Sequence, residues 1–128
     1  MFIKKIAGCI IIEDNKVLLL KKTTRNWYEL PGGTIEDSES KEDAAVREMR
    51  EEIGCDVEIL SLFKEEEYPH KGKTAHGTWF IAKIAQGQRP SLAEPEEFSE
   101  LRFVPIDELE NISVSPNVEN MLAELVVQ

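Results

Sequence analysis

The sequence has few cysteines, no long apolar run and no cluster of basic residues, and each absence excludes a class of protein. Its two cysteines, Cys9 and Cys55, both lie in apolar runs, which predicts buried free thiols rather than a disulfide framework or a metal site. No run approaches the roughly 20 apolar residues of a transmembrane helix. No apolar segment of about 7–15 residues precedes Ile6–Cys9, as a secretory signal would require. We therefore expect a cytoplasmic protein with no membrane partner.

The charge of the chain limits the kind of ligand that it binds. Acidic residues number 25 and basic residues 15, so the net charge is −10, and the lysines and arginines are scattered. Long nucleic acid is excluded as a partner, because binding a phosphate backbone requires a basic surface. A small anionic substrate stays compatible with this charge if metal ions bridge it to carboxylates. The length of 128 residues predicts one domain over residues 1–128, as either a monomer or a homodimer.

The order of the predicted elements indicates the fold class. Strands are predicted at Ile3–Glu13, Lys16–Lys22, Trp27–Leu30, Asp56–Tyr68, Thr74–Ala85 and Glu100–Pro105. Helical segments are predicted at about Ser40–Ile53, Ile106–Leu109 and Pro116–Val126. Pro31–Gly33 is expected to break the chain, and Gln86–Ser99 to form an acidic loop. Strands mixed with two main helices in a small domain predict an α/β fold, in which helices cover both faces of a sheet.

A 23-residue segment from Gly33 to Cys55 carries the strongest signal, GTIEDSESKEDAAVREMREEIGC. A capping box at its Ser40 predicts the start of a helix, and Gly54 predicts its end. At about 100° per residue, three glutamates of this helix fall within one arc of roughly 100°. These glutamates are Glu48, Glu51 and Glu52. The opposite, core-facing side is predicted to hold Ala45, Val46, Met49 and Ile53.

Three glutamates on one helix face suggest a bound cation. Like charges at this spacing repel by a few tenths of a kcal/mol per pair. A hard divalent cation reverses that sign, because carboxylate oxygens are preferred ligands of Mg²⁺, Mn²⁺ and Ca²⁺. A solvated acidic helix is the alternative, since 20 of the 128 residues are glutamate. Even so, chance would produce the spacing of glutamate, arginine and glycine in this segment only about 10⁻⁵ times per chain of this composition.

The segment resembles the Nudix box in order and spacing. The matching residues are Gly33, Glu39, Arg47, Glu48, Glu51, Glu52 and Gly54. Cys55 departs from the bulky aliphatic residue that usually ends the box. The flanking Leu30–Gly33 and Leu101–Val104 also resemble the family. The resemblance implies a mixed sheet in an α/β/α sandwich and a MutT-like member of the Nudix hydrolases.

The resemblance also implies the chemistry. Nudix enzymes hydrolyse a nucleoside diphosphate linked to another group, and MutT-like members convert a nucleoside triphosphate to a monophosphate and pyrophosphate. The implied cofactor is Mg²⁺, with Mn²⁺ as the alternative. The implied metal ligands are the carbonyl of Gly32 and the carboxylates of Glu48, Glu51 and Glu52, with Glu52 also a candidate base. Arg47 is expected to orient a carboxylate. Glu39 either supports the metal site or is a favourable charge at the start of the helix.

Residues outside the box complete the predicted site. The family often adds a carboxylate from a loop, for which Glu97 is the first candidate here and Glu100 the second. Lys22 is a candidate for contacting phosphate, Trp27 for stacking on a base and Asn117 for binding a purine edge. For each of these three the structural alternative stays open: a solvated charge, a core aromatic and a residue at the start of a helix.

Two other functions remain open from the sequence. Some ADP-ribose and dinucleoside polyphosphate hydrolases of the family carry a proline or tyrosine about fifteen residues beyond the box. Here Tyr68 and Pro69 lie 13 and 14 residues after Cys55. A catalytically silent nucleotide-binding module is the third possibility, although the intact set of glutamates argues against it. In every case the expected partner is a small nucleotide.

Overall fold

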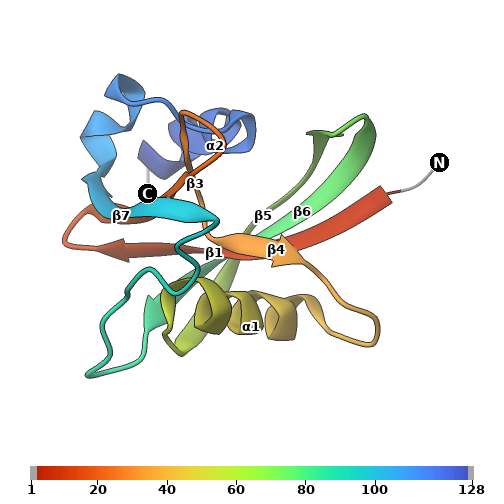
Figure 1. Ribbon diagram of the computed structural model, residues 1–128, viewed down its shortest axis with the longest axis horizontal. Coiled ribbons are helices and arrows are strands. Elements are labelled where there is room, and N and C mark those ends of the chain that lie inside the picture. Colours follow the sequence, from red (N-terminus) through yellow and green to blue (C-terminus); the bar gives the residue numbers. More distant parts are fainter. Residues whose placement is uncertain (1–2, 127–128) are drawn as a thin grey trace.

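The computed structural model describes residues 3–126 and contains a mixed sheet with two main helices (Figure 1). The strands are β1 (Ile3–Glu13), β2 (Lys16–Lys22), β3 (Tyr28–Glu29), β4 (Gly32–Thr34), β5 (Val57–His70), β6 (Lys73–Ile84) and β7 (Phe98–Pro105). The helices are α1 (Lys41–Ile53), a 3₁₀ helix η1 (Ile106–Asn111) and α2 (Pro116–Val126).

The long strand β1 organises the sheet. It runs parallel to β6 and antiparallel to β2 and β4, and β5 and β7 pair with β6 and β2 respectively. The turn between β1 and β2 is formed by Asp14 and Asn15, both with positive φ, as the tightest hairpin turns require. A second hairpin joins β5 to β6 through Lys71 and Gly72, which also have positive φ. The parallel β1–β6 pair and the antiparallel hairpins confirm the predicted mixed sheet.

The core has two parts, one on each face of the sheet. Alternate residues of β1 point to opposite faces, so Ile6 and Ile10 join one apolar cluster while Cys9 and Ile11 join the other. The first cluster includes Val118, Met121 and Leu125 of α2. The second includes Ala44, Ala45, Met49 and Ile53 of α1. Figure 1 shows α1 and α2 on opposite sides of the sheet, which confirms the predicted sandwich.

One strand was not predicted. Gly32–Thr34 form β4, whereas the sequence predicts only a break at Pro31–Gly33. Gly32 pairs with Gly8 of β1, and a Cβ on Gly8 would overlap the carbonyl oxygen of Pro31 and the ring of Trp79. The close approach of two backbones needs glycine at this position. The same glycines that indicate a turn therefore permit a strand, and β4 places the loop before α1 against the centre of the sheet.

Other elements agree with the prediction or differ only at their ends. β1, β2 and α2 have the predicted limits, while β7 begins two residues early, at Phe98, and β3 is shorter than predicted. Cys9 and Cys55 are buried free thiols, as predicted. Burial raises the pKa of Cys9 to about 12, which keeps the thiol protonated. Within residues 3–126, no helix has the length and apolar character needed to cross a membrane.

Candidate active site

Helix α1 is fixed at both ends by the residues that predict it. The Ser40 side chain accepts a hydrogen bond from the Asp43 backbone N–H at 3.0 Å, which satisfies a free donor of the first turn. Gly54 ends the helix with φ of 68°, and its N–H donates to the Arg50 carbonyl at 3.2 Å. These caps set the two ends of α1, whereas its packing against the sheet sets the direction in which its glutamates point.

The glutamates of α1 do not all face solvent. Glu48 and Glu52 are buried, at 8% and 5% exposure, beside Met49 and Ile53. Glu51 is exposed, with 47% of its side chain accessible. The prediction that the apolar residues occupy the side opposite the glutamates was therefore wrong. Glu52 projects only about 60° from Met49 on the helix, so the packing that buries one also buries the other.

Arg47 holds the acidic residues in place. Its guanidinium donates to Glu39 at 2.7 Å, to Glu48 at 2.9 Å and to Glu51 at 3.0 Å, and it also reaches the Thr34 carbonyl at 2.9 Å. The hydrogen bond to Arg47 lowers the pKa of Glu39 and keeps that carboxylate charged. Arg47 thus connects the loop before α1, the end of β4 and two of the three glutamates.

Glu52 has the most perturbed environment of the three. Its Oε1 accepts a hydrogen bond from the Gly32 backbone N–H at 2.8 Å, which connects α1 to β4. Burial, and then the negative charge of Glu48, raise the pKa of Glu52 to about 9. Burial also raises the pKa of Glu48. Glu48 and Glu52 are thus two neighbouring buried carboxyl groups whose ionisation is disfavoured, a perturbation typical of functional sites.

Gly33 leaves the space that the Glu48 carboxyl group occupies. A Cβ at this position would lie 2.5 Å from both carboxylate oxygens of Glu48. We expect Gly33→Ala to displace the Glu48 carboxyl group, because the end of a flexible side chain moves more easily than backbone. Activity and metal affinity should fall by about 10–100-fold. The melting temperature should stay near the wild-type value, and a strong drop in it would show that the backbone, rather than Glu48, had moved.

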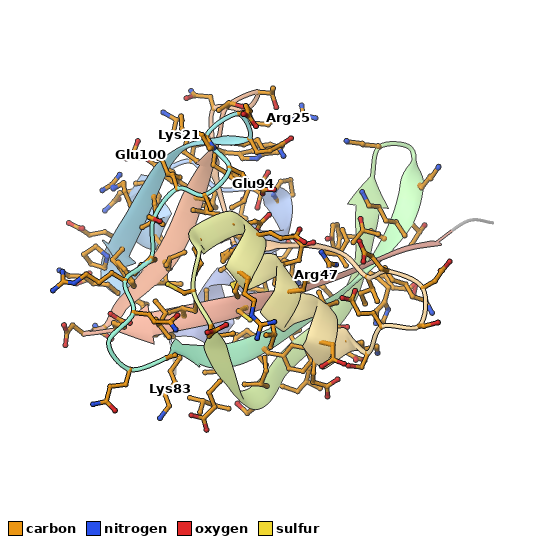
Figure 2. The ribbon with its side chains drawn as sticks, turned by 60° about the horizontal axis from the view of Figure 1, so that its bottom comes forward. Lys21, Arg25, Arg47, Lys83, Glu94 and Glu100 are labelled. Atoms are coloured by element: carbon orange, nitrogen blue, oxygen red, sulfur yellow. The ribbon has the colours of Figure 1, made fainter. Side chains whose placement is uncertain are left out.

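The loop between β6 and β7 is attached to the end of α1. The backbone N–H groups of Ser91 and Ala93 donate to the carbonyls of Ile53 and Glu52, at 3.0 and 3.2 Å. The next residue, Glu94, is close enough for its charge to raise the pKa of both Glu48 and Glu52. Burial and Glu51 raise the pKa of Glu94 in turn. Glu94 is therefore the loop carboxylate whose charge acts on the glutamates of α1, and Figure 2 shows it near the end of that helix.

The two predicted loop carboxylates make other contacts. Glu97 accepts a hydrogen bond from Lys22 at 3.0 Å, and its side chain is 56% exposed. Glu100 accepts from the Tyr28 hydroxyl at 2.9 Å and lies farther along, on β7. The distance in sequence before β7 predicts Glu97 as the loop carboxylate. The attachment of the loop to α1 instead brings Glu94 close to Glu48 and Glu52. No sequence signal distinguishes Glu94 from its acidic neighbours.

A cavity of about 420 Å³ adjoins this cluster at β4. Lys22 and Trp27 line it together with Gly32, so three of the predicted site residues meet here. Trp27 donates from its indole N–H to Glu29 at 2.7 Å, and the Arg25 guanidinium lies 5.5 Å from its ring centre. Asn117 belongs to α2, but its side chain lies outside the described part of the structure.

The acidic groups are held by the protein's own donors rather than arranged around a cation. Across the described residues, no three acidic, histidine or cysteine side chains converge in a geometry that holds a metal ion. Arg47 binds Glu48 and Glu51, and the Gly32 N–H binds Glu52. The roles of these residues as metal ligands thus stay predictions.

Comparisons with known proteins agree with the sequence and the fold. A family model described as NUDIX domain matches residues 3–125. An uncharacterized Nudix hydrolase of Bacillus subtilis (strain 168), YvcI, is 30% identical over 126 residues, which cover 94% of this chain and 78% of that protein. An ADP-ribose pyrophosphatase of Methanocaldococcus jannaschii is 33% identical over 103 residues, covering 75% of this chain and 61% of that protein. The chain thus spans less than two thirds of the second relative.

A solved structure shows the same fold. The crystal structure of a MutT NUDIX hydrolase from Burkholderia pseudomallei superposes with a TM-score of 0.87 at 22% identity, covering 96% of this chain and 98% of the other. The prediction of a MutT-like enzyme that cleaves phosphoanhydride bonds is confirmed at the level of the family. With the glutamate segment, the sandwich and the family match in agreement, the chain belongs to the Nudix hydrolase family.

Proposed function

We propose that this protein hydrolyses a nucleoside triphosphate to a nucleoside monophosphate and pyrophosphate with a divalent cation, Mg²⁺ or Mn²⁺. The observation that carries the proposal is the buried Glu48–Glu52 pair, which contacts Gly32 and Gly33 of β4, because these two glycines also line a cavity with cationic and aromatic side chains. The pair supplies a place for a cation, and the cavity supplies a place for a small nucleotide.

The residues present fit a hard cation. Burial raises the cost of ionising both Glu48 and Glu52, the charge of Glu48 adds to that cost at Glu52, and a bound cation would offset it. Gly33 has no side chain, which lets the Glu48 carboxyl group lie against β4 beside Glu52. The Gly32 carbonyl and Glu48, Glu51 and Glu52 would hold the cation. When bound, it supplies positive charge that neutralises phosphate oxygens and makes water a stronger acid.

The remaining chemistry belongs to the side chains. Arg47 orients Glu48 and Glu51, so it positions these groups without contacting the substrate. Glu52, once its carboxyl group is ionised, accepts the proton of the attacking water as the new P–O bond forms and the bond to pyrophosphate breaks. Glu94 is the further loop carboxylate, in place of Glu97. Lys22 reaches the cavity while paired with Glu97, which suits it to contact a phosphate group.

A second candidate substrate is ADP-ribose or a dinucleoside polyphosphate. The observation that favours it is the position of Tyr68 and Pro69, which both line the cavity. The relative from M. jannaschii carries the name ADP-ribose pyrophosphatase. In both candidates the bond that breaks is a phosphoanhydride, and the candidates differ only in the group attached to it.

The products identify the substrate class. The protein, incubated with Mg²⁺ or Mn²⁺, would be offered normal and oxidised nucleoside triphosphates, ADP-ribose and diadenosine polyphosphates. We expect a monophosphate and pyrophosphate from a triphosphate, and loss of turnover when the cation is chelated. AMP and ribose phosphate as the main products would favour the second candidate. Tight nucleotide binding with no turnover of any compound would instead support a catalytically silent module.

A further inference from the structure

Four basic side chains line the cavity. They are Lys4, Lys22, Arg25 and Lys71. They come from segments far apart in the chain: the start of β1, the end of β2, the β2–β3 loop and the β5–β6 turn. The fold therefore gathers four cations around one cavity in a chain whose net charge is −10.

Among the described residues, three of these cations have no carboxylate partner. Lys22 pairs with Glu97, but within residues 3–126 no salt bridge to an acidic side chain involves Lys4, Arg25 or Lys71. Among the described residues that line the cavity, only Glu29 is acidic. Its Oε2 accepts a hydrogen bond from the Trp27 indole N–H. Glu97 is thus the acidic residue that offsets part of this charge, through its salt bridge to Lys22 and a weaker interaction with the charge of Lys71, while Lys4, Arg25 and Lys71 form no salt bridge among the described residues.

The basic residues also repel one another. Partial burial lowers the pKa of Lys4, and the charges of Lys71, Lys73 and Lys22 lower it further. Solvated lysines on an acidic protein would separate or pair with a carboxylate, as Lys41 pairs with Glu65 and Lys83 with Glu58. Like charges held together at a cavity favour an anion that is not part of the protein.

We infer that Lys4, Arg25 and Lys71 form a subsite for a phosphate group beyond the diphosphate held at the glutamates. The inference rests on the proposed function, and it names the substrate class: nucleotides with at least three phosphates, rather than ADP-ribose, which has two. Strand β4 connects the glutamates to the subsite, because Gly32 and Gly33 contact Glu52 and Glu48 and also line the cavity with the basic residues. A third phosphate would neutralise the unpaired cations, whereas a terminal ribose would leave them unpaired.

Kinetics of matched variants test the subsite. The test variant is Lys4→Met/Lys71→Met. The control variant, Lys16→Met/Lys83→Met, removes the same amount of charge from residues that do not line the cavity. Figure 2 shows Lys83 far from Arg25, which does line it. We expect KM for a nucleoside triphosphate to rise about 10-fold per lost contact in the first variant only. KM for ADP-ribose should change less than about twofold. Equal effects on both substrates, or in both variants, would overturn the inference.

A binding measurement separates this inference from the proposed function. Calorimetric titration of inorganic tripolyphosphate with the cation chelated needs no turnover. We expect the Lys4→Met/Lys71→Met variant and Arg25→Gln to weaken this binding about 10-fold per contact, while the control variant binds like the wild type. That result supports the subsite even if no nucleotide is hydrolysed. Unchanged binding in both test variants, alongside normal turnover, would overturn the subsite and leave the proposed function standing.

Discussion

Replacing Glu52 by glutamine is expected to lower kcat by about 10²–10⁴-fold, the range typical for removing a group that accepts a proton in the reaction. The substitution removes the negative charge and the proton acceptor but keeps the size of the side chain. The amide oxygen can still accept the Gly32 N–H that Glu52 Oε1 accepts at 2.8 Å. A neutral amide also relieves the repulsion from Glu48, so the melting temperature should stay the same or rise. Turnover and thermal unfolding would be measured on the same preparation.

The control for this variant is Glu42→Gln, which removes an exposed carboxylate from the first turn of the same helix. Its kcat should match that of the wild type. If Glu52→Gln also retained wild-type kcat, the metal site and the base would both have to be sought elsewhere.

Arg47→Ala is expected to reduce both activity and stability. It removes hydrogen bonds to Glu39, Glu48, Glu51 and the Thr34 carbonyl, and it leaves the buried Glu48 without a cationic partner. The free energy of unfolding should fall by about 1–3 kcal/mol, which lowers the melting temperature by roughly 5–10 °C in a domain of this size. kcat/KM should fall about 10–100-fold, as for other groups that orient metal ligands.

Arg50→Ala provides the matched control. Arg50 lies on the same helix as Arg47, but it pairs at 2.6 Å with an exposed carboxylate beyond the helix, that of Asp56. Exposed pairs contribute about 0–1 kcal/mol, so this variant should be almost unchanged. Arg47→Lys should behave more like Arg47→Ala than like the wild type, since an ammonium group cannot bridge four acceptors in a plane. Full activity of the Arg47→Lys variant would show that Arg47 supplies only charge.

The sequence predicts those parts of the fold that depend on local chemistry. Ser40 and Gly54 limit α1 because capping needs only neighbouring residues, and the apolar stripe of α2 sets its length in the same way. The near-continuous apolar run of β1 predicts a buried strand, and its residues join the apolar clusters on both faces of the sheet. The clustering of Glu48, Glu51 and Glu52 can be predicted because it follows from their spacing on one helix and requires no knowledge of tertiary contacts.

Features that depend on distant contacts could not be predicted. β4 exists because Gly8 and Gly32 allow two backbones to approach, and the sequence does not show which glycines will meet. Glu94 reaches the site only because Ser91 and Ala93 bond to the end of α1. The burial of Glu48 and Glu52 depends on how α1 rotates against the sheet. In each case the deciding partner lies far away in the sequence.

The two-part core places the residues expected to carry out the reaction and the residues that shape the cavity on different faces of the sheet. The glutamates belong to a helix that packs on one face of the sheet, whereas Ile6, Leu30 and Trp79 of the cavity pack on the other. Substitutions that reshape the cavity can therefore accumulate without disturbing the packing under the glutamates. A lineage with this architecture can change its substrate by drift on one face while selection preserves the reaction on the other.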